Sequence, residues 1–201
     1  MTDSIARQVD YDEAGTGPTI VLVPGSCSTG AAWRPVTAGW QGRYRYVTTS
    51  LLGYGGTAER RTAADPAIAH EASAVEAVIR HAGVPCHLVG HSFGALVSLA
   101  VALRGQVPLR SLTVIEAPAV GLLRDRAEAL HDATFRDMTT AYFAAFHGGD
   151  AAAIGTMIDL YGGAGINCLR APPHGRVGRF RYRPPPVAPS VWDGHWATAP
   201  S

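Results

Sequence analysis

The chain has 201 residues, of which 47% are hydrophobic and 16% are charged. This balance is typical of a globular protein with its own core and excludes a largely disordered chain. The formal net charge of +1 gives no reason to expect a nucleic acid as a partner. The first residues lack the apolar segment of a secretory signal, no apolar run is long enough to span a bilayer, and the three scattered cysteines fit neither a disulfide framework nor a metal site. We therefore expect a cytoplasmic protein with no membrane span, no nucleic-acid partner and no cofactor.

Residues 1–122 alternate between expected strands and expected helices. The dipeptide Asp65-Pro66 has the composition of a helix start, with an N-cap followed by proline in the first turn. Short connections between alternating strands and helices predict a doubly wound, mostly parallel sheet. The expected strands are 8–14, 19–23, 44–49, 86–89 and 110–115, and the expected helices are 33–40, 65–83 and 93–103.

The pattern changes after residue 122. Apolar residues recur at helical spacing from Leu123 to Phe146, and Asp150 is placed to cap a further helix. Two successive helices after an α/β segment predict a helical lid over 123–161. Residues 162–201 hold 7 of the 14 prolines and 5 of the 17 arginines, a composition that predicts an irregular, disordered tail.

The segment from Gly90 to Gly94 reads Gly-His-Ser-Phe-Gly, between an apolar strand and an apolar helix. A serine on such a tight strand-to-helix turn presents its hydroxyl outward, and the two glycines give the turn the room that it needs. Ser92 is therefore the candidate nucleophile of the chain. A small polar residue in a glycine-rich turn is the alternative interpretation of the same pattern.

Through this segment and two others, residues 8–161 resemble the α/β-hydrolase superfamily. Gly90 to Gly94 looks like the nucleophile elbow of that family. The run Val21 to Ser26 is similar to its strand and oxyanion loop, with Pro24 in the place of the usual histidine. Leu52 to Thr57 looks like the loop that usually carries Asp-x-x-Gly-x-Gly, with Ser50 in the place of the aspartate. The resemblance implies an α/β-hydrolase sheet with a helical lid, and we expect its C-terminal half-sheet to be incomplete in this sequence.

The resemblance implies acyl transfer on a small-molecule substrate, such as an apolar ester, thioester, lactone or amide. Ser92 would attack the substrate, and the backbone N–H groups of Ser26 and Phe93 would bind the oxyanion. The matching positions for the acid and the base are Glu116, after the strand that follows the elbow helix, and His195, in a Gly-His-Trp segment. His91 is disfavoured as the base because neighbouring side chains on the turn diverge.

Four alternatives remain open at this point. The change in composition near 162–168 also fits a frameshifted product or a hydrolase-like binding module without catalysis. Perhydrolysis and carbon–carbon bond hydrolysis use the same serine elbow. A dehalogenase or an epoxide hydrolase needs a carboxylate nucleophile, so the serine at position 92 argues against both.

Overall fold

A computed structural model describes residues 9–119, except 41, 63 and 84, and residues 129–153. By their internal contacts the described residues fall into two compact units. The first contains the described residues up to Pro118, and the second contains the later helices.

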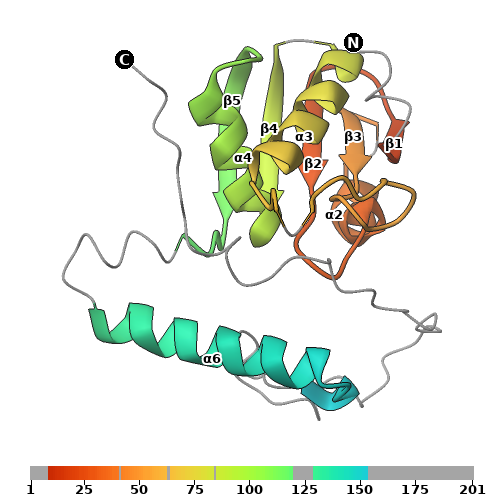
Figure 1. The fold of residues 1–201 in the computed structure, drawn as a ribbon. Helices are drawn as coiled ribbons and strands as arrows, with labels where there is room; N and C mark the ends of the chain where they lie inside the picture. Colours follow the sequence, from red (N-terminus) through yellow and green to blue (C-terminus); the bar gives the residue numbers. More distant parts are fainter. Residues whose placement is uncertain (1–8, 41, 63, 84, 120–128, 154–201) are drawn as a thin grey trace. The chain divides into compact units, whose positions relative to one another are not determined.

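The first unit is a five-stranded sheet with the strand order β1-β3-β2-β4-β5 (Figure 1). The edge strand β1 is antiparallel to β3, and the other neighbours are parallel. This arrangement confirms the predicted mostly parallel α/β sheet. The strands are β1 Tyr11–Ala14, β2 Thr19–Val23, β3 Arg45–Thr49, β4 Cys86–His91 and β5 Leu109–Ile115.

Two helices, α3 (Ala69–Ala82) and α4 (Phe93–Arg104), lie side by side across one face of this sheet (Figure 1). A short 3-10 turn, η1 (Gly30–Trp33), leads into α2 (Arg34–Ala38) and packs against β2 and β3. Apolar side chains from the strands and from α3 and α4 form the core, because both kinds of element have an apolar face to bury. Fully buried examples are Val21, Leu22, Val23, Val47, Val78, Ile79, Leu88, Val97 and Val101.

Two of the predicted helix boundaries are wrong. α3 begins at Ala69 and not at Asp65-Pro66. The carboxylate of Asp65 lies 2.7 Å from Nε2 of His70, and its backbone N–H donates to the Thr62 hydroxyl, so Asp65 forms a turn instead of a cap. The helix expected over 33–40 ends at Ala38, and Val36 on its expected apolar face is 48% exposed.

The second unit contains α6 (Ala129–His147) and a 3-10 turn, η2 (Ala151–Ala153). Tyr142, Phe143 and Ala153 form its small apolar core. The carboxylate of Asp150 accepts the N–H of Ala152 at 2.8 Å, in agreement with the predicted cap at this position. The rest of the helix predicted after Asp150 lies outside the described residues. Leu123, where the long helix was expected to begin, and the tail over 162–201 lie outside the described residues.

Candidate active site

Ser92 is the single residue between the end of β4 and the start of α4. Its backbone is in the positive-φ region, with φ of 52° and ψ of −125°. The Ser92 N–H donates to the carbonyl of Ile115 at 2.8 Å, and its carbonyl accepts the N–H groups of Ala95 and Leu96 in the first turn of α4. A positive φ strains the backbone of a residue other than glycine, so contacts with its neighbours must stabilise this conformation.

The two glycines of the motif are required by close packing around this turn. A Cβ atom on Gly90 would lie 2.5 Å from both the Gly94 carbonyl oxygen and the Ser98 hydroxyl. A Cβ atom on Gly94 would lie 2.2 Å from the carbonyl oxygen of Pro24. The spacing Gly-x-Ser-x-Gly therefore allows α4 to pack directly on the ends of β4 and β2.

The loop after β2 lies next to Ser92. β2 and β4 are parallel neighbours with Val23 opposite Gly90, so the residues that follow the two strands leave the sheet at the same edge. A Cβ atom on Gly25 would lie 3.0 Å from Cβ of Ser92. Ser26 is exposed, and among the residues that the structure describes its N–H has no hydrogen-bond partner. Phe93 is buried at the start of α4.

Glu116 follows β5 directly and forms an ion pair with His91. Its carboxylate lies 3.5 Å from Nε2 of His91, and the two side chains are 81% and 45% exposed. Glu116 has a φ of 53°, so a second non-glycine residue near Ser92 adopts a strained backbone. The structure thus brings Glu116 to the residue before Ser92. His195 lies outside the described residues.

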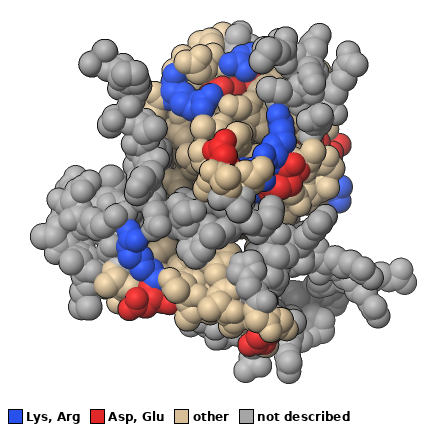
Figure 2. Space-filling model, in the orientation of Figure 1, with Lys and Arg blue, Asp and Glu red and all other residues tan. Residues whose placement is uncertain are grey.

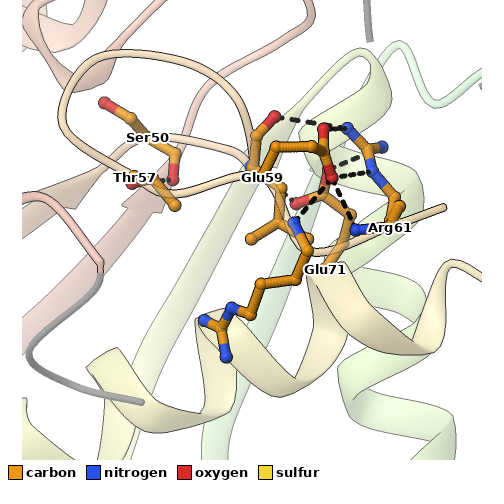
Figure 3. A network of polar contacts seen from close by, with 7 residues as sticks. Ser50, Thr57, Glu59, Arg61 and Glu71 are labelled. Carbon is orange, nitrogen blue, oxygen red and sulfur yellow. Dashed lines mark hydrogen bonds and ion pairs between the residues drawn. The ribbon is translucent and has the colours of Figure 1, made fainter. Parts of the chain in front are cut away.

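The loop between β3 and α3 contains a buried ionic network that the sequence interpretation missed (Figure 3). Arg61 lies between Glu59, at 2.7 Å, and Glu71, at 2.9 Å, and the Arg61 and Glu71 side chains are only 3% and 1% exposed. Glu71 also accepts the N–H of Leu52 at 3.1 Å, and Arg61 donates to the Leu52 carbonyl at 3.2 Å. The network therefore fixes both backbone groups of Leu52 in the loop that resembles the Asp-x-x-Gly-x-Gly segment.

Burial raises the pKa of Glu71 to about 7, against the opposing effect of the Arg61 guanidinium. Burial also acts to raise the pKa of Glu59, but the hydrogen bonds from Arg61 outweigh it and lower that pKa. The sequence signal for this network is an acidic residue in the first turn of α3, ten positions after an arginine. Such a spacing is common in sequences, so it identifies an ion pair only once the path of the chain is known.

Tyr54, also missed, joins this loop to the loop after β2. Its phenol hydrogen-bonds both the backbone and the side chain of Cys27, which has a φ of 60°. Burial raises the pKa of Tyr54, and the neighbouring thiol of Cys27 raises it further. The phenol therefore stays protonated at neutral pH and remains available as a donor.

Charged side chains of both signs lie close together on the face drawn in Figure 2. Among the described residues on that face, the two signs alternate and form no single-signed patch. Among the described helices, none is long and apolar enough to cross a membrane.

The chain belongs to the family described as the Alpha/beta hydrolase family, whose profile matches residues 20–201. The match agrees with the five-stranded sheet and with the strand–serine–helix arrangement at Ser92. The predicted resemblance is therefore confirmed at the level of family and fold.

Known relatives of the chain have more than one activity. It is 31% identical over 121 residues to a pimeloyl-[acyl-carrier protein] methyl ester esterase of Aeromonas hydrophila, covering 58% of this chain and 44% of that protein. It is 29% identical over 102 residues to haloalkane dehalogenase 2 of Mycobacterium bovis, covering 50% and 35%. The chain thus spans less than half the length of either relative.

A solved α/β hydrolase from Sphaerobacter thermophilus superposes with a TM-score of 0.50. The identity is 24%, over 70% of this chain and 56% of that one. This likeness concerns the fold alone.

Proposed function

We propose that this chain is a serine hydrolase that cleaves a small, largely apolar ester, thioester, lactone or amide through an acyl-enzyme. The observation that carries the proposal is the approach of Gly25 to Ser92, since a Cβ atom on Gly25 would lie 3.0 Å from Ser92 Cβ. That approach brings the backbone of the loop after β2 to the serine whose attack would place a negative charge on the substrate carbonyl oxygen. The esterase of Aeromonas hydrophila among the relatives supports the same chemistry.

In this mechanism the Ser92 hydroxyl attacks the substrate carbonyl carbon and gives its proton to a base. The carbonyl oxygen gains the negative charge, and the N–H groups of Ser26 and Phe93 bind it. Such donors are aimed at charge that develops only during the reaction, and each contributes about 3 kcal/mol to lowering the barrier. The intermediate then expels the leaving group, which takes the proton from the base, and water releases the acyl group by the reverse sequence.

We propose His195 as the base and Glu116 as the acid that orients it. His91 is the alternative base against which His195 is compared, because His91 precedes Ser92 and forms an ion pair with Glu116. His195→Ala is expected to lower turnover by about 10⁶-fold and Glu116→Gln by about 10⁴-fold. If His91→Ala abolishes turnover and His195→Ala does not, the base is His91 and our assignment is wrong.

The nucleophile itself is tested with a fluorophosphonate probe on the full chain, followed by digestion and mass spectrometry. We expect the label on the peptide that contains Ser92 and no label on Ser92→Ala, whose circular dichroism spectrum should match that of the wild type. An unlabelled wild type, under conditions that label a known serine hydrolase, would overturn the proposal. The chain would then be a hydrolase-like binding module.

A further inference from the structure

The peptide that joins Gly25 to Ser26 is held by a side chain from the same loop. The hydroxyl of Ser28 donates a hydrogen bond to the carbonyl oxygen of Gly25 at 2.9 Å. In a trans peptide the C=O and the following N–H lie in one plane and point in opposite directions. Holding the Gly25 carbonyl therefore sets the direction of the Ser26 N–H. This N–H has no hydrogen-bond partner among the described residues.

A second contact holds the next peptide of the loop. The phenol of Tyr54 hydrogen-bonds the backbone of Cys27, which follows Ser26. Tyr54 is itself fixed by two backbone hydrogen bonds of 3.0 Å, from its N–H to the Leu51 carbonyl and from the Thr57 N–H to its own carbonyl. The peptides on both sides of Ser26 are thus restrained by the side chains of Ser28 and Tyr54.

From these contacts we propose that Ser28 is a positioning residue for the oxyanion donor of Ser26, with Tyr54 as a second restraint on the same loop. The inference rests on the proposed function and adds a residue to it. Electrostatic stabilisation of an oxyanion depends on donors that are already oriented before the reaction, since reorienting them costs part of the gain. Ser28 acts through the Gly25 carbonyl and touches no reacting atom.

A purely structural role is the alternative, because serine hydroxyls often bond to nearby backbone carbonyls in turns. The two roles differ in what they change. A loss of loop stability lowers the free energy of unfolding, whereas a misdirected Ser26 N–H lowers kcat and leaves KM nearly unchanged, since the oxyanion forms only in the transition state.

The test compares Ser28→Ala, Ser28→Thr and a matched control in the full chain, using a chromogenic ester. The control is Ser73→Ala, because the Ser73 hydroxyl also donates to a backbone carbonyl, that of Ala69 at 2.8 Å. Ser73 contacts Arg104, which is the last residue of α4. Arg104 lies about 16 Å along the helix axis from Phe93, the residue that follows Ser92. Removing this hydroxyl should leave kcat and KM unchanged.

We expect Ser28→Ala to lower kcat by about tenfold, less than the 10²- to 10³-fold loss of a whole donor. Its KM should stay within about twofold of the wild type, and Ser28→Thr, which keeps the hydroxyl, should recover most of the loss. If Ser28→Ala does not fold, Tyr54→Phe and Ser28→Thr decide the question. Tyr54→Phe should lower kcat at constant KM, while Ser28→Thr retains it.

An unchanged kcat in Ser28→Ala, or a raised KM with constant kcat, overturns the positioning role. In that case Ser92 of the wild type still takes the fluorophosphonate, so the proposed function stands. A wild type without label on Ser92 removes both, and the labelling experiment alone separates the two failures.

Discussion

At the scale of single residues, the elbow depends on positions where no side chain fits. Gly94 lies against the carbonyl oxygens of Pro24 and Val23, at 2.2 and 2.7 Å from the place of an added Cβ atom. These are backbone atoms at the end of a central strand, so they cannot rotate away as a side chain could. Any residue larger than glycine must separate α4 from β2.

Gly94→Ala is therefore expected to lower the free energy of unfolding by about 2–3 kcal/mol, the usual effect of overpacking a core. Urea unfolding followed by circular dichroism measures the change. Gly39→Ala is the matched control, because Gly39 has a φ of −74° and the nearest atom to an added Cβ is 3.5 Å away. The control should be unchanged or more stable by up to about 1 kcal/mol. Similar losses in both variants would contradict the packing argument.

At the scale of elements, buried ion pairs stabilise the loop between β3 and α3. Arg61 and Glu71 are almost fully buried, and together they bind both the N–H and the C=O of Leu52. Removing one member of such a pair leaves a charge in the interior without its partner, which usually costs more than the pair contributes. Tyr54 lies in the same loop, so the network also supports the contact with Cys27.

Arg61→Met is expected to lower the free energy of unfolding by about 3–4 kcal/mol at pH 8, where the Glu71 carboxyl is ionised and would remain buried without the Arg61 cation. Arg80→Met is the control. Arg80 is 40% exposed, and its ion pair with Glu76 is 3.6 Å long, so its loss should cost no more than about 1 kcal/mol. Equal effects in urea unfolding would show that the buried network does not hold the loop.

At the scale of the whole molecule, the buried carboxyl of Glu71 makes stability depend on pH in an unusual direction. Its pKa of about 7 in the folded chain is above the ordinary value near 4.5. Between these pH values the folded state binds a proton that the unfolded state has released, so the free energy of unfolding falls as pH rises. Glu59 and Asp65 act in the opposite sense, since their lowered pKa values stabilise the fold above about pH 4.5 and that gain is lost in acid.

We expect the chain to be more stable at pH 5 than at pH 8, by roughly 2 kcal/mol from Glu71. Urea unfolding at the two pH values measures the difference. In Glu71→Gln the carboxyl group is absent, so the difference should largely disappear. A wild type that is equally stable at both values would contradict the raised pKa.

Local patterns were sufficient to predict part of the fold. The strand over 19–23 has the predicted bounds because its run of β-branched residues has no competing helical period. The helix expected at Asp65 shows the limit of such reasoning. Asp65 has the composition of an N-cap, but the nearby imidazole of His70 takes its carboxylate, and the helix begins four residues later.

The sequence by itself determined the alternation of strands and helices, the family and the turn that carries Ser92. These features depend on short-range spacing, above all on glycines at two fixed distances from the serine. Only the tertiary structure decided which groups meet across the turns: Arg61 with Glu71, Tyr54 with Cys27, and Glu116 with His91. Such pairs depend on the path of the backbone through space, because a charge or a hydroxyl selects its partner by distance and burial and not by its position in the chain.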